Sequence, residues 1–354
     1  MLLLPFQITD VKDANNPVII NSGNTSTNGG NGIAFIDVTP NDQYDTPRMP
    51  KLKVQFMGCP AGLTVQWRFH STFPRPNGHQ TTDDRNFPDS DENGVAELPG
   101  NQAWDISQYY TNPDQFFGGS CTIYYTLLRA NRTTLGPEQS MTFRIQGHNP
   151  DSRHAAAYIQ SLPDCRDDST HNGKWYATWI GEEESAQDPY ILNQFNSPKA
   201  SSREGKLYDP CFGSPSGWGM FQRDDHEQGI FVDTDQVWNW QVNAQVATQQ
   251  EMAQKETAAA NYVDNIAYNN PTTFEEPEFF TSTPGHTAWG VPVYGQTALA
   301  ITLYNGSGGL SYSQILHFDP TKPAGHRWTF TPPNAPGSTE PYINKVMERY
   351  NADH

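Results

Sequence analysis

The sequence predicts two domains of different class, an all-β sandwich followed by a mainly α-helical domain. Three observations lead to this prediction. Up to about residue 147, several stretches alternate apolar and polar side chains, whereas most later stretches have helical periodicity. A Gly-His-Asn-Pro-Asp run at 147–151 separates the two parts. The length of 354 residues also suits two domains. We therefore expect domains at 1–147 and 148–354.

The first domain is predicted from four stretches of alternating hydrophobicity. They are 51–57, 63–69, 121–125 and 140–145. Alternation is typical of half-buried strands, because successive side chains point to opposite faces of a sheet. The Cys59, Trp67, Cys121 order is loosely similar to that of an immunoglobulin domain, although Trp67 follows Cys59 closely. We expect two packed sheets that are immunoglobulin-like only in this loose sense.

The second domain is predicted from helix-forming stretches. They are 154–162, 174–185, 237–267, 296–306 and 341–350. Asp151 and Ser152 are candidate caps for the first, Gly306 is a suitable end for the fourth, and Pro341 suits a first helical turn. We therefore expect a mainly α-helical fold after the boundary.

Composition and charge exclude several classes of partner. The chain has 39 acidic and 22 basic residues, a formal charge of −17, and no cluster of Lys and Arg that would bind phosphates. We expect no nucleic-acid partner and no insertion into membranes, since no apolar run approaches the roughly 18 residues of a membrane helix. The sequence contains neither a phosphate-binding P-loop motif nor a CxxC pair, and we expect no cofactor and no metal.

The N-terminus and the cysteines give information on the cellular compartment in which the protein acts. MLLLPFQITD is too short for the apolar region of a signal peptide and has no preceding positive charge. The protein either stays inside, leaves by a route without a cleavable signal, or has lost its signal. Disulfides Cys59–Cys121 and Cys165–Cys211 would imply an oxidising destination. Four buried free thiols are the alternative, because spacing alone does not determine pairing.

An acidic run at the end of an aromatic-rich helix supplies candidates for acid catalysis. Glu182, Glu183 and Glu184 follow Trp179 and Ile180. A carboxylic acid stays protonated near neutral pH in an apolar setting and beside other carboxylates. Helical phase does not separate the candidates, since Glu184 lies one turn from Ile180 and Glu183 one turn from Trp179. A solvated helix end is the alternative interpretation.

Two later segments combine glycines with aromatic and amide side chains. Residues 217–224 read GWGMFQRD, in which Trp218 and Phe221 would stack on sugar rings and Gln222 would hydrogen-bond to them. Residues 303–309 read LYNGSGG, where a helix runs into a glycine-rich loop. Each segment also has an alternative interpretation when it is taken singly. The first would be a β-turn whose aromatic residues pack in the core, and the second would be the C-terminal cap of a helix.

Taken in order, these segments resemble the lytic transglycosylase and goose-type lysozyme group. The family pattern is a helix ending in Glu-Ser, then Gly-x-Gly-Leu-Met-Gln, then Ala-x-x-x-Tyr-Asn-x-Gly. This chain has Glu184-Ser185, then GWGMFQ at 217–222, AITLYNG at 300–306, and a last helix similar to the family's own. The resemblance covers about 154–350. It departs from the pattern at Met220-Phe221 and in polar insertions after Phe195 and Ile266.

The resemblance implies a lysozyme-like domain that cleaves the β-1,4 bond between N-acetylmuramic acid and N-acetylglucosamine in peptidoglycan. Glu184 would be the catalytic acid and base, because it is the Glu that precedes Ser. Tyr304 would hydrogen-bond near Glu184, and Asn305 would lie close by. The substrate-binding set would be Ser185, Gly217, Trp218, Gly219, Met220, Phe221, Gln222, Tyr304 and Asn305.

Two outcomes of this cleavage are open. A lytic transglycosylase needs one Glu, which protonates the leaving oxygen and then accepts the proton of the 6-hydroxyl that closes a 1,6-anhydro ring. An inverting muramidase needs a second carboxylate to activate water, with the two carboxyl groups roughly 6.5–9.5 Å apart. Asp224 is the candidate base, Asp209 is a weaker one, and Asp224 as an ordinary turn residue is the alternative.

Other function classes are a catalytically inactive glycan-binding or structural protein and a chitinase-like hydrolase. The β-domain would bind glycan, contact a delivery apparatus or act as a spacer. Its aromatic residues Tyr109, Tyr110, Phe116 and Phe117 would stack on sugars or, as core packing, fill the interior. We expect an antibacterial effector or phage-type lysin that reaches the periplasm or cell wall by a signal-independent route, with peptidoglycan strands and a periplasmic immunity or inhibitor protein as partners.

Overall fold

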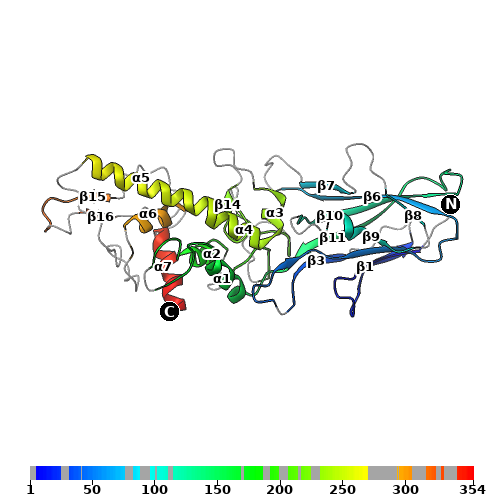
Figure 1. Ribbon diagram of the computed structural model, residues 1–354, viewed down its shortest axis with the longest axis horizontal. Helices are drawn as coiled ribbons and strands as arrows, with labels where there is room; N and C mark the ends of the chain where they lie inside the picture. The colour runs from blue at the N-terminus through cyan, green and yellow to red at the C-terminus, as the bar shows by residue number, and fades with distance from the viewer. Residues whose placement is uncertain are drawn as a thin grey trace. The chain divides into compact units, whose positions relative to one another are not determined.

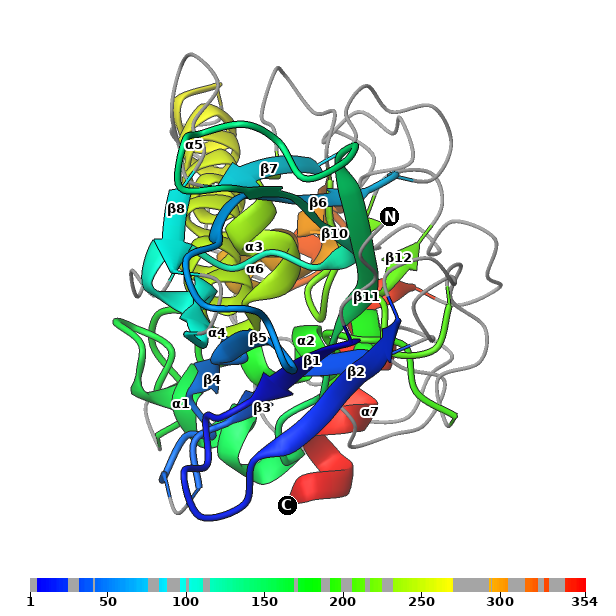
Figure 2. The same cartoon turned by 90° about the vertical axis from the view of Figure 1, so that its right-hand side faces the viewer.

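The structure is a computed structural model of the chain, and contacts within it divide the chain into two compact units. Unit 1 comprises Met1–Pro150 and Asn193–Gln241, and unit 2 comprises Asp151–Leu192 and Val242–His354. Figures 1 and 2 show the elements from two sides. The residues described are 5–24, 32–40, 42–75, 83–87, 96–99, 102–110, 115–168, 171–185, 192–198, 206–213, 217–224, 232–269, 293, 295–304, 316–323, 328–330 and 341–354.

Unit 1 contains two large sheets that form a curled half-barrel, and not the expected immunoglobulin-like sandwich. The first has the order β2-β1-β5-β9, and Figure 2 shows β1 and β2 side by side in blue. Its strands are β1 (Pro5–Asp10), β2 (Val18–Asn24), β5 (Leu52–Phe56) and β9 (Trp104–Asp105). The second has the order β4-β3-β11-β10-β6-β7, with β8 also paired to β6, and only β3 and β11 are parallel among the strand pairs described. Its strands are β3 (Ile33–Val38), β4 (Pro47–Arg48), β6 (Thr64–Phe73), β7 (Asp83–Phe87), β8 (Ala96–Pro99), β10 (Gly119–Leu128) and β11 (Gln139–Gly147).

The four alternating stretches are strands, which confirms that part of the prediction. They become β5, β6, β10 and β11, and their apolar side chains are buried at every second position. Trp67 on β6 stacks on Trp104, with ring centroids 6.0 Å apart. Tyr110, which follows the short 3-10 helix η2 (Ile106–Tyr109), is buried, as are Phe116 and Phe117. These three aromatic rings therefore fill the core, whereas the side chain of Tyr109 lies outside the described part.

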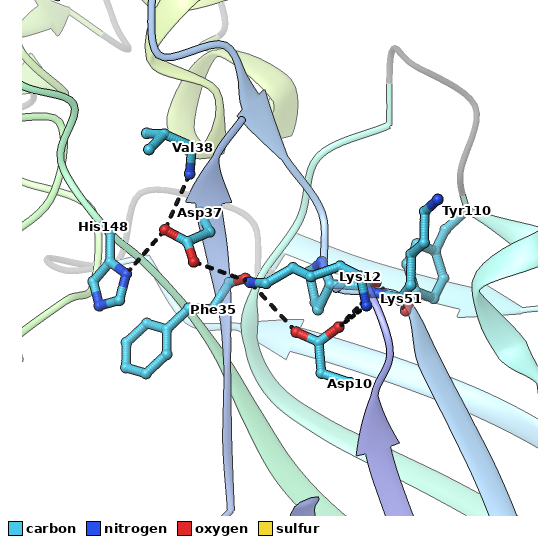
Figure 3. Close-up of polar contacts among 9 residues, drawn as sticks. Asp10, Lys12, Phe35, Asp37, Val38, Lys51, Tyr110 and His148 are labelled. Carbon is cyan, nitrogen blue, oxygen red and sulfur yellow. Dashed lines mark hydrogen bonds and ion pairs between the residues drawn. The ribbon is translucent and has the colours of Figure 1, made fainter. Parts of the chain in front are cut away.

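A lysine links the two sheets of unit 1 (Figure 3). The Lys12 ammonium donates a hydrogen bond to the Phe35 carbonyl of β3 at 2.7 Å. It also forms ion pairs with Asp10 of β1 at 3.3 Å and with Asp37 of β3 at 3.4 Å. Asp37 lies 3.4 Å from the Nδ1 atom of His148, and this hydrogen bond, with Lys12, holds the Asp37 pKa well below its usual range. The network fixes the end of β1 against β3.

The prediction of a mainly α-helical domain after residue 147 is wrong. Helices and strands have comparable shares of the structure, and this part of the chain contains strands of its own. β12 (Phe212–Gly213), β13 (Gly217–Trp218) and β14 (Arg223–Asp224) form a three-stranded sheet within unit 1. Phe73 at the end of β6 contacts the rings of Trp238 and Trp218, at 5.1 and 6.1 Å. Segment 193–241 therefore completes the core of the β-rich unit. Short strands held by such long-range contacts leave no periodicity in the sequence.

The helices of unit 2 are close to the expected positions. The helices are α1 (Ser152–Ser161), α2 (Ala177–Ser185), α5 (Ala253–Asn269), α6 (Gly295–Tyr304) and α7 (Tyr342–Asp353). Asp151 caps α1, because its carboxylate accepts the backbone N–H of Arg153 at 2.9 Å. α2 packs against α1 and α7, α5 packs against α6, and α6 packs against α7. In Figure 1, α6 (orange) and α7 (red) are neighbours. A two-stranded sheet of β15 (Leu316–Phe318) and β16 (Trp328–Phe330) also belongs to this unit.

The long helix expected at 237–267 is interrupted. Asn239 has an extended backbone, φ −119° and ψ 108°, and separates α3 (Thr234–Trp238) from α4 (Trp240–Val246). A π-helical turn, η4 (Ala247–Met252), then leads into α5. Within the residues described, no helix has the length and apolarity needed to cross a membrane.

All four cysteines have free thiols, so neither expected disulfide is formed. The Cys121 thiol donates to the Ser71 hydroxyl at 3.6 Å inside the core. Cys59 is half-buried and lies within 3.8 Å of the Pro60 carbonyl. The Cys165 thiol lies 3.4 Å from the Pro163 carbonyl, and Cys211 is buried. The alternative that the spacing left open, free thiols, is the one present.

Candidate functional site

The acidic run lies in the last turn of α2. The first half of the helix is fixed in the core of unit 2 by Trp179 and Ile180, both buried. Glu182, Glu183 and Glu184 follow in the turn that ends the helix, at the end where the macrodipole is negative. Acidic side chains are unfavourable there, so the surroundings must compensate them. Helix α7 supplies the compensation.

One face of α7 contacts the end of α2. Tyr342, Lys345, Arg349 and Asp353 are spaced by three or four residues and therefore lie on the same side of the helix. The indole N–H of Trp179, at the start of α2, donates to the Asp353 carboxylate at 2.8 Å. Contacts to the end of α2 are made near the start of α7, so the two helices run antiparallel. We call these four residues the α7 ladder.

Glu183 is ion-paired to two residues of the ladder. Its carboxylate accepts hydrogen bonds from the Nη2 and Nε atoms of Arg349, at 3.1 and 3.3 Å. Lys345 Nζ lies 3.6 Å from the other carboxylate oxygen. The Glu183 side chain is 15% exposed, so this is a partly desolvated ion pair. Glu183 is therefore held in place and is not a mobile surface charge.

Glu182 is a buried acid without a cation of its own. Its residue exposure is 4%, and its Oε2 atom has no hydrogen-bond partner within the described part of the chain. Burial, together with the negative charge of Asp353, raises the pKa of Glu182 to about 8, against a smaller opposite effect of Arg349. Glu182 therefore stays protonated at neutral pH, and its side chain is almost fully buried.

Glu184 helps to raise the pKa of a buried tyrosine, Tyr342, at the start of α7. Tyr342 is 3% exposed, and its pKa is raised well above the usual value by burial and next by the charge and hydrogen-bonding potential of Glu184. Tyr304, the last residue of α6, contributes further to that rise. No partner of the Tyr342 hydroxyl meets ordinary hydrogen-bond geometry among the described residues, so its contact with Glu184 is a loose one. Tyr342 remains a neutral O–H donor beside the half-buried Glu184.

Two of the predicted site residues influence the same buried hydroxyl. Glu184 and Tyr304 come from different helices, both helices pack against α7, and both residues raise the pKa of Tyr342, with the larger effect from Glu184. Ser185 ends α2, but its side chain lies outside the described part, as does the whole of Asn305. Tyr342 belongs to the last helix, which the family resemblance includes without giving this residue a role. The three- and four-residue spacing of the α7 ladder is the sequence signal that identifies a shared helix face there.

The predicted sugar-binding segment is part of unit 1. Trp218, Met220 and Phe221 are buried, with at most 1% exposure, so their side chains pack in the interior. The indole of Trp218 contacts Phe212 at 4.7 Å. Gly217, on β13, is packed against the Gln222 side chain, since an added Cβ would lie 2.9 Å from its Cβ. The rings therefore have no free face for a sugar to stack on.

Two backbone positions of this segment are in the left-handed region. Gly219 has φ +72° and Gln222 has φ +46°. The Gln222 side chain turns back and donates to the Gly219 carbonyl at 2.6 Å, which closes the turn between β13 and β14. The main-chain N–H of Met220 donates to the Gln194 side chain at 3.2 Å. The glycine-rich segment is thus a tight, internally bonded turn.

The two candidates for a second carboxylate differ in their surroundings. Asp224 lies on β14 opposite Gly217, and its side chain is outside the described part. Asp209 is 5% exposed and pairs with Arg144 at 2.9 Å, and Gln146 also donates to it at 3.4 Å. Asp209 therefore joins a partly buried ion pair to β11, a structural role.

No group of three or more His, Cys, Asp or Glu side chains among the described residues has the arrangement of a metal site. The sequence matches no protein-family model, and no curated protein matches it either.

Proposed function

We propose that this protein cleaves the β-1,4 bond between N-acetylmuramic acid and N-acetylglucosamine in peptidoglycan, with Glu184 as the acid. The observation that supports the proposal is that α2, which carries Glu184, and α6, which ends at Tyr304, both pack against α7, and that Glu184 and Tyr304 both raise the pKa of the buried Tyr342 on α7. The motif order singles out Glu184 and Tyr304, which are 120 positions apart in the chain.

The proposed chemistry needs one group that gives and then takes a proton. Glu184 would protonate the glycosidic oxygen as the bond to the muramoyl carbon breaks. In ring closure, Glu184 would then accept the proton of the muramoyl 6-hydroxyl as that oxygen bonds to the anomeric carbon. In hydrolysis, a second carboxylate would take the proton of the attacking water, and Glu184 would regain its proton from solvent. Tyr342, kept neutral by burial, would donate to Glu184 while that group is ionised and so hold its orientation.

Two glutamine variants test the assignment of the acid. We expect Glu184→Gln to lower the rate of sacculus digestion by about 10²–10⁴-fold, the usual contribution of an acid or base group, with an unchanged fold. Glu182→Gln is the matched control, because the same chemical change is made two residues away at a side chain that is almost fully buried. Turbidity of purified sacculi and circular dichroism measure both. Full activity of Glu184→Gln, or loss only in Glu182→Gln, contradicts the proposal.

The products distinguish the two reactions. Anhydro-muramic ends in mass spectra of the digest support ring closure by Glu184 alone, and reducing muramic ends indicate hydrolysis with a second carboxylate. Asp224→Asn tests the second reaction, because Asp224 is the candidate base for activating water.

Two other results would assign a different function. If the protein digests chito-oligomers and leaves sacculi intact, it is a chitinase-like hydrolase. If it binds glycan without cleaving it, it has a glycan-binding role.

The proposed substrate lies outside the inner membrane of bacteria. The protein would therefore act after transfer to the periplasm or cell wall, with an inhibitor protein in the producing cell. Expression with a periplasmic leader should lyse a bacterium, whereas cytoplasmic expression should not. Equal growth of both strains, with stable protein in each, would contradict this location of action.

A further inference from the structure

The end of α2 carries three adjacent carboxylates at the unfavourable end of a helix. Negative side chains in a last helical turn are destabilising, because the helix macrodipole is negative there. Gly181 lies in the same turn, and glycine inside a helix costs about 1 kcal/mol relative to alanine. Local sequence therefore does not hold this turn in a helical conformation. Contacts with another element must do so.

The contacts come from two cations of the α7 ladder. Lys345 and Arg349 are four residues apart, and both reach Glu183, the middle residue of the acidic run. Arg349 contributes two nitrogens to one oxygen, at 3.1 and 3.3 Å, so the direction of the Glu183 side chain is fixed as well as its distance. The side chains are 15%, 31% and 20% exposed for Glu183, Lys345 and Arg349. Partial burial makes the loss of one partner costly.

The same helix face also orients the next residue. Tyr342 precedes Lys345 by three positions and contacts Glu184, which follows Glu183 directly. Fixing Glu183 on α7 therefore fixes the rotation of the last turn of α2, and with it the direction in which Glu184 points. A turn released from Lys345 and Arg349 would let Glu184 leave Tyr342.

We propose that Glu183, clamped by Arg349 and Lys345, is the positioning residue that keeps Glu184 against Tyr342. The clamp acts through Glu184 and does not touch the substrate. This inference rests on the proposed role of Glu184 as the acid. It gives a role to the partly buried ion pair of Glu183 next to the reacting residue.

Charge exchange tests the clamp. We expect Glu183→Gln and Arg349→Gln each to lower kcat on soluble glycan fragments by about 10–100-fold, because small misplacements of a reacting group have effects of this size, while KM stays within about twofold. The double variant Glu183→Arg with Arg349→Glu restores an ion pair in the reverse sense and should recover most of kcat. Arg153→Gln is the matched control, since Arg153 is 89% exposed and, among the described residues, pairs with Asp151, the cap of its own helix.

A second readout separates the clamp from the enzymatic proposal. In carbon-13 spectra of tyrosine-labelled protein, the Tyr342 signal, assigned with Tyr342→Phe, should move in Glu183→Gln and return in the charge-exchanged variant. If the wild-type chain cleaves no glycan but the signal follows this pattern, the proposed function fails and the clamp stands. Wild-type kcat per folded molecule in Glu183→Gln, or no recovery of kcat and signal in the double variant, overturns the clamp.

Discussion

Three adjacent glutamates at residues 182–184 have three different environments. Glu182 is buried, Glu183 pairs with two cations, and Glu184 influences a buried tyrosine. Residue type and neighbours in the chain are nearly the same for all three. Their surroundings differ because different residues of α7 act on each one. Adjacent carboxylates can therefore have different electrostatic environments when a second helix packs against them.

The raised pKa of Glu182 makes stability depend on pH. The folded protein holds the Glu182 proton up to a pKa of about 8, and the unfolded chain releases it near the ordinary value of 4.5. The contribution of this group to the free energy of unfolding is therefore complete below about pH 4.5 and is lost as pH rises to about 8.

Glu182→Gln removes this pH dependence, because a neutral amide needs no proton. We expect the melting temperature of the variant, relative to wild type, to increase by about 4 °C or more between pH 5 and pH 8.5, since 1 kcal/mol corresponds to roughly 2–4 °C at this size. Calorimetry in both buffers measures it. The exposed pair Arg68–Glu138 offers a control, and Glu138→Gln should show no such increase. A pH-independent difference would contradict the burial of Glu182.

At the scale of elements, Lys12 joins β1 to β3 across the two sheets (Figure 3). Its ammonium faces Asp10, which is 4% exposed and accepts backbone N–H groups of Lys12 and Lys51 at 3.0 Å. The buried carboxylate is thus satisfied by backbone donors on one side and by Lys12 on the other. Hydrogen bonds along strands stabilise each sheet, but this ion pair connects the sheets.

Lys12→Met should weaken this connection. The change keeps the apolar stem but leaves Asp10 and Asp37 without their shared cation, so we expect the free energy of unfolding to fall by about 3 kcal/mol. Urea denaturation followed by tryptophan fluorescence measures the effect. Lys53→Met on the exposed side of β5 is the control and should change it by no more than about 0.5 kcal/mol. Equal effects in the two variants would show that Lys12 makes no connection between the sheets.

At the scale of the whole molecule, the four cysteines share one chemical state. All four cysteines are free, and burial raises the pKa of Cys121 to about 12 and of Cys165 to about 11. A high pKa keeps a thiol protonated and slow to react. Only Cys59 is part-exposed, and burial raises its pKa as well.

Alkylation of the denatured protein should therefore label four thiols. In denaturant without a reductant, we expect a mass gain of four adducts, and in the native state at pH 8 a single adduct, at Cys59. Intact mass spectrometry gives both numbers, and a Cys59→Ser variant confirms the position of the native adduct. A gain of two or none in denaturant would mean that disulfides form in the cell, contrary to the free thiols seen here.

The sequence predicted secondary structure correctly where apolar side chains recur with one regular spacing. Strands β5, β6, β10 and β11 follow from alternation, because one face of each meets a core. The cap of α1 follows from Asp151. The helical prediction failed for 193–241, because aromatic residues there are buried against β6 and not along a helix stripe. The break at Asn239 escaped prediction for a related reason, since the flanking residues favour helix.

The sequence by itself determined four strands of the first half (β5, β6, β10 and β11), the approximate positions of α2 and α7, and the order of the motifs that singles out Glu184 and Tyr304. Only the tertiary structure decided which glutamate is protonated, which is clamped and which contacts Tyr342. Those properties depend on burial and on charges that are more than 150 residues away in the chain, from Glu183 to Lys345 and Arg349. Desolvation and Coulomb forces act through space, so helix packing sets them and local sequence does not.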